Sequence, residues 1–178
     1  LAAGGSMIFL PKFDAGAVLD WLPKATSMMG VPTFYVRLLA EPGFSRDLVG
    51  HIRLFTSGSA PLLAETHVQF EARTGHRILE RYGMTEVGMA LSCGLAFEDR
   101  VDASVGWPLP SVQARLVDVD TGEVIPEGQD VDPATGRERA GEIQLRGPTI
   151  FQEYWRNPDA TAKEFVTDPN DDSSSGGR

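Results

Sequence analysis

The 178-residue sequence predicts an α/β fold, in which a layer of helices and parallel strands is followed by a β-rich portion. Three observations support this prediction. The composition is globular, with 42% hydrophobic and 23% charged residues. Up to residue 103, short apolar runs alternate with amphipathic helical patterns, which is typical of a parallel sheet. From Ser104 onward, apolar and polar residues alternate singly, which favours antiparallel strands.

Residues 1–103 are expected to alternate between strands and helices. The expected elements are a buried strand at 6–10, a helix at 14–22, a strand at 26–31, a helix at 32–41, a strand at 52–59, a helix at 62–75 and a strand at 77–83. Asp14 is a favourable N-cap for the first helix, and Pro23 can end it. Pro32 suits the first position of the second helix, and Gly75 suits the end of the third. The strand–helix order predicts a parallel sheet.

Residues 104–167 are expected to be rich in antiparallel strands. Within 111–125, apolar and polar residues alternate on both sides of a Thr-Gly turn, as in a hairpin. The remaining expected elements are a polar, acidic loop at 126–141, a strand at 141–147, a short helix at 157–165 and a disordered acidic, Gly/Ser-rich tail at 168–178. We therefore expect one partial domain over residues 1–167, followed by the tail.

Composition and charge narrow the possible functions. With 16 basic and 25 acidic residues, the net charge is -9, which argues against a nucleic-acid duplex or an anionic membrane surface as partner. No apolar stretch is long enough for a membrane span. The single cysteine, Cys93, excludes an internal disulfide and is expected to be inert packing. The histidines, His51, His67 and His76, lack the spacing of a metal site and are expected at the surface.

The two ends of the sequence suggest a piece of a longer polypeptide, since the first residue is Leu1 and the last stretch is of low complexity. The apolar run near the start has no charged region before it, so it is not a signal peptide. We expect an intracellular protein, cytoplasmic or mitochondrial, whose targeting segment is not visible in this sequence.

Small residues follow the expected strand at 52–59. Ser57, Gly58, Ser59 and Ala60 lie where this strand ends, and α/β proteins place ligands at the carboxyl ends of parallel strands. Because Gly58 has no side chain and its neighbours are small, the backbone can come close to a flat or anionic group. A Gly-Ser turn after a strand is most often only a turn, so this loop alone is weak evidence.

The sequence ERYGMTE, residues 80–86, places several ligand-binding groups at the end of the next strand, and residues 82–86 are expected to form the loop after that strand. Tyr82 offers a ring for stacking, Thr85 a hydroxyl donor and Glu86 a hard carboxylate ligand for Mg²⁺. Gly83 provides the turn. An aromatic face, a hydroxyl and a Mg²⁺-binding acid are the groups that a nucleotide site needs.

In this order, the segments resemble the adenylate-forming enzymes, which include acyl-CoA synthetases, luciferases and peptide-synthetase adenylation domains. The resemblance is carried by MMGVPTFYVRLL at 28–39, SGSAPL at 57–62, YGMTE at 82–86, SVGWPLP at 104–110 and GEIQLRGPTIFQEYWRNPDAT at 141–161. It implies part of the large N-terminal, AMP-binding domain of such an enzyme. ATP, Mg²⁺ and coenzyme A are then the expected nucleotide, metal and acyl acceptor.

The resemblance also assigns roles to residues. Thr85 and Glu86 would be catalytic, through phosphate and Mg²⁺. The nucleotide-binding residues would be Gly58, Ser59, Ala60, Glu80, Tyr82, Gly83 and Thr85, with Ser57, Arg81 and Met89 binding the acid substrate. Tyr82 would stack on adenine, with a half-buried turn aromatic as the alternative. Glu80 would accept a hydrogen bond from the adenine amino group or be exposed, and Met89 would line the acyl pocket or belong to the core.

Within the family, GVPTFY, SGSAPLLAETH and ERYGMTE are most similar to the malonyl-CoA synthetases. Many relatives that take uncharged acids carry a small residue at the position of Arg81. The distal carboxylate of a dicarboxylate needs a cation, and an arginine can hold it through two hydrogen bonds. Malonate is therefore the expected acid. The structural alternative is that Arg81 is a solvated charge paired with Glu80.

Several parts of the family have no counterpart in these 178 residues. They are the Ser/Thr-rich phosphate loop, the Thr-Gly-Asp segment that holds ribose and the C-terminal domain with its lysine. We therefore expect the isolated chain to be inactive. The alternatives to a malonate enzyme are a synthetase for another acid, such as methylmalonate, a catalytically dead nucleotide-binding module and a truncated gene product.

Overall fold

The structure is a computed structural model that describes residues 4–129, 131–133 and 135–166. Its helices are α1 (Ala15–Trp21), the 3-10 turn η1 (Leu22–Lys24), α2 (Pro32–Leu39), α3 (Arg46–Val49), α4 (Ala64–Thr74) and α5 (Pro158–Glu164). Its strands are β1 (Ser27–Gly30), β2 (Leu54–Ser57), β3 (Leu79–Met84), β4 (Gly88–Ser92), β5 (Trp107–Pro108), β6 (Gln113–Asp118), β7 (Val124–Ile125) and β8 (Gly141–Arg146).

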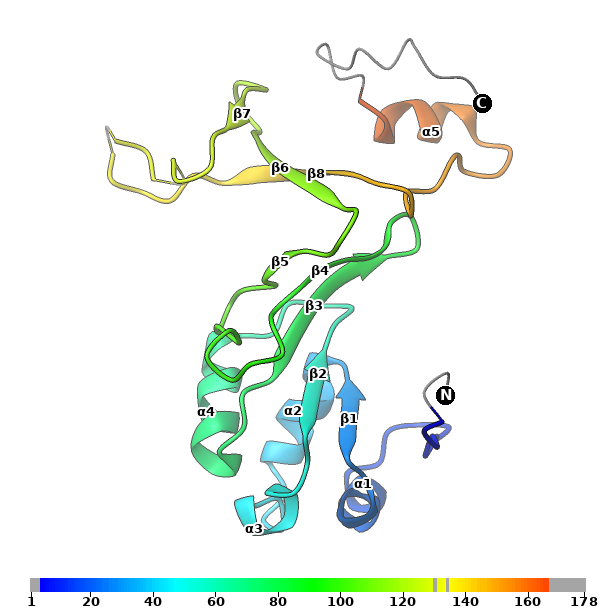
Figure 1. The fold of residues 1–178 in the computed structure, drawn as a ribbon, viewed down its shortest axis with the longest axis vertical. Coiled ribbons are helices and arrows are strands. Elements are labelled where there is room, and N and C mark those ends of the chain that lie inside the picture. Colours follow the sequence, from blue (N-terminus) through cyan, green and yellow to red (C-terminus); the bar gives the residue numbers. More distant parts are fainter. Residues whose placement is uncertain (1–3, 130, 134, 167–178) are drawn as a thin grey trace.

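The strands form two sheets that follow one another along an elongated molecule (Figure 1). The first has five strands in the order β1-β2-β3-β4-β5, and the second has three in the order β7-β6-β8. Helices α1 to α4 lie beside the first sheet, whereas α5 lies near the second (Figure 1). The predicted α/β part followed by a β-rich part is confirmed. None of the helices in the described ranges has the length and apolarity that a membrane crossing requires.

The first sheet is parallel only over its first three strands. β1, β2 and β3 pair in parallel, as the strand–helix order predicts, but β3 then forms an antiparallel hairpin with β4. The expectation that residues 82–86 form a loop after the strand is therefore wrong in part. Tyr82, Gly83 and Met84 belong to β3, and the turn covers only residues 85–87. Gly83 and Gly88 flank this turn, and glycines at these positions allow the chain to reverse within three residues.

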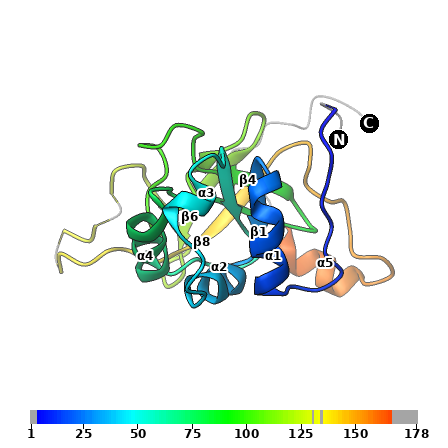
Figure 2. The same cartoon turned by 90° about the horizontal axis from the view of Figure 1, so that it is seen from below.

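The core lies between the first sheet and helices α2 and α4. Phe70 of α4 packs edge-on against Tyr35 of α2 and Phe55 of β2, with ring centroids 5.5 Å and 5.0 Å away. The Tyr35 hydroxyl donates a hydrogen bond of 2.6 Å to the Thr56 carbonyl. Viewed from below, α4, α2 and α1 lie side by side along the sheet (Figure 2). This aromatic cluster fixes the position of β2, whose end carries residues 57–60.

The predicted helix ends are confirmed, with one adjustment. Asp14 Oδ1 accepts a hydrogen bond of 2.9 Å from the Ala17 amide, Pro32 occupies the first turn of α2, and Gly75 ends α4 with a left-handed φ of 76°. Pro23 does not end the first helical segment at once, because it lies inside η1. A proline is tolerated there, since the first amides of a helical turn need no partner within it.

The expected buried strand at 6–10 is wrong. Met7 and Phe9 are 63% and 78% exposed, and no strand in the described ranges pairs with this segment. An isolated extended segment without a neighbour forms no ladder of hydrogen bonds, whatever its apolar content. The four-residue helix α3 was not predicted, because it is too short for a helical periodicity to show.

The second sheet confirms the hairpin predicted within 111–125. β6 is its central strand and pairs antiparallel with β7 and β8. The first sheet continues as far as Pro108 through β5, and the second begins at Gln113. The predicted helix at 157–165 is α5, in which Asn157 Oδ1 accepts a hydrogen bond from the Ala160 amide. The tail predicted at 168–178 lies outside the described residues.

Replacing Phe70 by alanine should lower the free energy of unfolding by about 3–5 kcal/mol, because its fully buried ring contacts three other aromatic rings. Chemical denaturation measures this value. Val68→Ala on the same helix is the matched control, since Val68 is 57% exposed and should change the value by less than about 0.5 kcal/mol. Equal losses in the two variants would contradict the position of the core.

Candidate functional site

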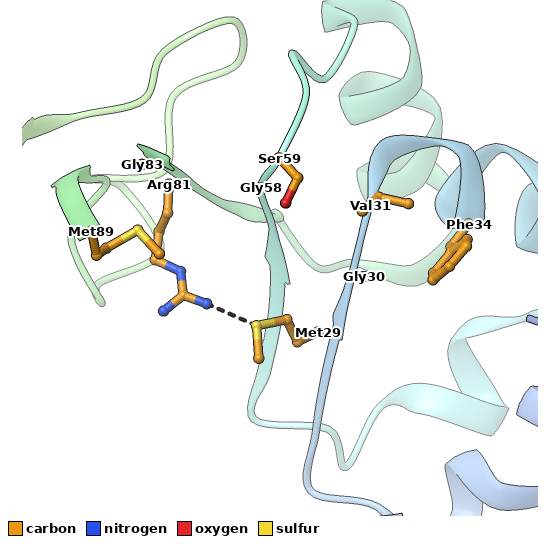
Figure 3. A pocket seen from close by; sticks show the side chains of 9 residues that line it. All are labelled: Met29, Gly30, Val31, Phe34, Gly58, Ser59, Arg81, Gly83 and Met89. Carbon is orange, nitrogen blue, oxygen red and sulfur yellow. Dashed lines mark hydrogen bonds between the residues drawn. The ribbon is translucent and has the colours of Figure 1, made fainter. Parts of the chain in front are cut away.

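A pocket of about 320 Å³ lies where β1 and β2 end and the β3–β4 hairpin passes them (Figure 3). This volume is at the lower end for small-molecule sites. The junction of β1 and α2 contributes Met29, Gly30, Val31 and Phe34, the loop after β2 contributes Gly58 and Ser59, and the hairpin contributes Arg81, Gly83 and Met89. The structure thus brings together predicted nucleotide-side and acid-side residues from segments far apart in the sequence.

Arg81 reaches this pocket and lacks a carboxylate partner among the described residues. Its Nη2 donates to Met29 Sδ at 3.0 Å, and its Nε is buried without a hydrogen bond. A thioether is only a weak acceptor, so most donors of the guanidinium remain unused. Glu80 does not pair with it, because successive side chains of a strand point to opposite faces and Glu80 contacts the α4 side. The alternative of an Arg81–Glu80 surface pair is excluded.

Gly83 allows the two strands of the hairpin to approach closely beside the pocket. A Cβ at this position would overlap the Gly88 carbonyl oxygen and lie 3.0 Å from Met89 Cα. Because Gly83 pairs with Met89 across the hairpin, its lack of a side chain lets both strands come together at the pocket. Met89 is 42% exposed and lines the pocket, so it does not belong to the core.

The last residue of β2 is buried, whereas the loop that follows it is more exposed. Ser57 is 1% exposed, and its hydroxyl has no hydrogen-bond partner among the described residues. Gly58 and Ser59 line the pocket, whereas Ala60 is exposed and lies outside its lining. Ser59 adopts a left-handed φ of 68°, a conformation uncommon outside glycine. Gly58, Ser59 and the Arg81 side chain thus line the same pocket (Figure 3).

Ser57, His67 and Glu80 form a buried polar cluster behind the pocket. Glu80 Oε2 accepts a hydrogen bond of 3.3 Å from the Leu62 amide, and Glu80 Oε1 lies 3.9 Å from His67 Nδ1. His67 and Glu80 are 2% and 4% exposed. The expected surface position of His67 is therefore wrong, as is an exposed Glu80. Their burial arises because α4 lies directly on the strands that carry Ser57 and Glu80, which are register partners.

Tyr82 is half-buried at the start of a second hydrophobic cluster, where its ring packs near Val87, Ala90 and Leu91. The cluster also includes Ile143 and Leu145 of β8, so it joins the two sheets. The ring is thus fixed by packing on one side and partly open on the other.

Thr85 and Glu86 lie in the turn of the hairpin. Thr85 is exposed and Glu86 is half-buried. The Tyr154 hydroxyl donates a hydrogen bond of 2.9 Å to Glu86 Oε1, and this bond raises the pKa of Tyr154 above its ordinary value. No group of three or more His, Cys, Asp or Glu residues able to hold a metal occurs in the described ranges. A cation at Glu86 would need ligands in addition to this carboxylate.

Comparison with known proteins identifies the family of this chain. The model of the AMP-binding enzyme family matches residues 1–155. The chain belongs to this family. Within it, the chain is 52% identical over 155 residues to a CoA ligase of Gibberella moniliformis, covering 78% of this chain and 26% of that protein. It is 37% identical to the mitochondrial malonate–CoA ligase of Mus musculus, covering 94% of this chain and 33% of that protein.

Solved structures of family members agree with the fold. The chain superposes on ATP-bound MatB from Rhodopseudomonas palustris with a TM-score of 0.81 and 51% identity, covering 91% of this chain and 30% of that one. A malonyl-CoA ligase complex with methylmalonyl-CoA and AMP gives a TM-score of 0.70 and 39% identity, covering 87% and 32%. The chain thus spans about a third or less of the length of these AMP-binding relatives.

Sequence reasoning missed several contacts of the candidate site. Met29 and Phe34 were not singled out in the sequence, and both line the pocket between β1, β2 and the hairpin. Tyr154 lies in a quoted family segment, but nothing in the sequence links it to Glu86, which lies 68 positions earlier. Cys93 is buried, as expected, and burial raises the pKa of its thiol. The thiol donates to the Ser104 carbonyl at 3.2 Å.

The buried polar cluster should behave as a coupled unit. In a double-mutant cycle with His67→Leu and Glu80→Met, each single change leaves the other buried group without its side-chain neighbour, so the coupling should be about 1–3 kcal/mol in the free energy of unfolding. The Glu71–Arg77 pair is the control, because it is closer, at 2.9 Å, but its side chains are 36% and 33% exposed. That coupling should stay below about 1 kcal/mol. Additive effects of the His67 and Glu80 changes would contradict the cluster.

Proposed function

We propose that the full-length protein containing this chain is an ATP-dependent malonate–CoA ligase. It converts malonate, ATP and CoA to malonyl-CoA, AMP and pyrophosphate through malonyl-AMP. The observation that carries this proposal is the Arg81 guanidinium, which reaches the pocket and whose hydrogen bond among the described residues goes to a thioether. The malonate–CoA ligases among the relatives support the same acid.

Arg81 selects the substrate by charge. A guanidinium in a half-buried pocket is costly unless an anion accompanies it, and its planar group can bind a carboxylate through two hydrogen bonds. Malonate carries a second carboxylate beyond the one that reacts with ATP. In the proposed complex, Arg81 binds this distal carboxylate, and the exposed thioethers of Met29 and Met89 adapt to the short carbon chain between the two acids.

In the proposed complex, the nucleotide lies where the loop after β2 meets the hairpin. We assign adenine stacking to the partly open ring of Tyr82, and contact with the nucleotide backbone to the loop of Gly58, Ser59 and Ala60. Because Gly83 has no side chain, β3 and β4 lie close together at the pocket, which leaves room for the two substrates to approach each other. Glu80 supports this region from behind: its carboxylate binds the Leu62 amide, so it holds the loop and the strand together.

Glu86 fits a Mg²⁺ ion that protein and nucleotide hold jointly. Proteins commonly bind Mg²⁺ through one or two carboxylates plus substrate phosphates, and the hairpin turn offers one carboxylate, whose Oε1 accepts from Tyr154 and whose Oε2 has no donor among the described residues. When bound, Mg²⁺ would neutralise charge on the phosphates. Thr85, exposed beside Glu86, donates its hydroxyl to a phosphate oxygen while the pocket directs the near carboxylate of malonate at the α-phosphate. No residue of this chain is assigned to CoA.

Methylmalonate is the second candidate acid, because one structural relative holds methylmalonyl-CoA. Both acids have the distal carboxylate that Arg81 requires, and they differ only by a methyl group that would face the flexible methionines.

The mitochondrial relative supports a mitochondrial location, with the cytoplasm as the alternative.

Arg81→Gly in the full-length protein should lower kcat/KM for malonate, because the distal carboxylate loses its buried partner. The expected loss of transition-state stabilisation is about 2–5 kcal/mol. Butyrate has no distal carboxylate and should lose little. The measured quantity is the ratio of kcat/KM for malonate to that for butyrate, and Arg53→Gly at an exposed position is the matched control. If this ratio changes by less than about threefold, below the 1.4 kcal/mol of a tenfold change, Arg81 does not select the acid.

Glu86→Gln should lower kcat by roughly 10²–10³-fold at saturating substrates, since it removes a charge that holds the cation where phosphate charge develops. Malonate affinity should change little. Steady-state kinetics over a range of Mg²⁺ concentrations test this prediction. Near-normal kcat at saturating Mg²⁺ would refute the metal role of Glu86.

The isolated 178-residue chain should form no malonyl-CoA, because the proposed reaction also needs a phosphate loop, a ribose-binding Asp and a lysine-bearing domain to position the reacting groups. A coupled pyrophosphate-release assay measures turnover. Malonate-dependent release of pyrophosphate by the isolated chain would refute the expected inactivity of the chain. The full-length protein is the positive control.

A further inference from the structure

Glu86 is held from two directions by one segment that follows the second sheet. The Tyr154 hydroxyl donates to its carboxylate Oε1 at 2.9 Å, and the Phe151 amide donates to its backbone carbonyl at 2.7 Å. Segment and turn are thus bonded through both the main chain and the side chain of one residue. A main-chain bond alone would fix the turn, so the hydroxyl bond serves to orient the carboxylate.

Tyr154 is itself fixed by the start of α5. Its amide donates to Thr161 Oγ1 at 2.9 Å, and its carbonyl accepts from the Asn157 amide at 3.1 Å. Its ring lies 4.8 Å from that of Phe151. The hydroxyl therefore has a defined position relative to the hairpin turn, set by α5 and not by Glu86 alone.

The bond leaves one oxygen of Glu86 available. No donor in the described ranges bonds to Oε2, whereas Oε1 is engaged by the hydroxyl. A phenol that donates to one carboxylate oxygen restricts rotation of the whole group, and groups that orient metal ligands in this way commonly change metal affinity by about 10–100-fold when they are removed.

We propose that Tyr154 is a positioning residue that orients the Glu86 carboxylate toward the cation–nucleotide complex. The inference rests on the proposed metal role of Glu86. It couples α5 and the second sheet to cation binding in the first sheet, through a single hydroxyl–carboxylate contact. Tyr154 contacts no reacting atom in this proposal and acts only through Glu86.

The test uses Tyr154→Phe in the full-length protein, which keeps the ring and removes the hydroxyl. The Mg²⁺ concentration for half-maximal turnover at saturating ATP should rise by about tenfold or more. The affinity for Mn²⁺ in the presence of ATP, measured by electron paramagnetic resonance without turnover, should fall by a similar factor. Trp155→Phe is the matched control, since Trp155 is 80% exposed, and both quantities should stay unchanged.

Thr161→Val provides a second variant in case Tyr154→Phe does not fold. It removes the acceptor of the Tyr154 amide but keeps the hydroxyl and the carboxylate, so it should produce the same shift to a smaller extent. Glu86→Gln separates the two proposals. If Glu86→Gln weakens cation binding while Tyr154→Phe and Thr161→Val leave it unchanged, the positioning role is refuted. If Glu86→Gln also has no effect, the metal role of Glu86 fails, and the positioning role fails with it.

Discussion

The site depends on the close approach of β3 to β4 at Gly83. Any side chain at that position would overlap the backbone of Gly88, so only glycine lets β3 leave its parallel neighbour β2 and turn back as a tight hairpin. The strand alternation that precedes Gly83 then sends Arg81 into the pocket and Glu80 toward α4. One short strand thereby separates the charge that we propose to select the substrate from a buried charge that contacts α4 and the Leu62 amide.

The two sheets meet around this hairpin. The second hydrophobic cluster extends from Tyr82 on β3 to Ile143 and Leu145 on β8, and the hydrogen bonds of Tyr154 and Phe151 hold the turn at Glu86. The apolar contacts and the polar contacts thus connect the same two sheets. The aromatic core under the first sheet holds the other wall of the pocket in place.

Much of the fold follows from local sequence signals. Asp14, Pro32 and Gly75 mark helix ends that depend on a single backbone group, and such groups act within a few residues. The hairpin partner of β3 and the burial of His67 could not be predicted in this way, since both depend on which distant segment lies alongside. The same holds for Tyr154, whose contact with Glu86 joins positions 68 residues apart. The sequence pattern suggested candidate chemical groups, whereas their neighbours could be found only from the tertiary structure.

The central claim is that a positive charge in the pocket selects an acid with two carboxylates. Acid-dependent exchange between ATP and labelled pyrophosphate measures the adenylation step alone, and the unmodified full-length protein can be compared with malonate, methylmalonate and butyrate. The account predicts that either dicarboxylate supports exchange at least about tenfold better than butyrate in kcat/KM, equivalent to about 1.4 kcal/mol. Equal exchange with butyrate and malonate would contradict it.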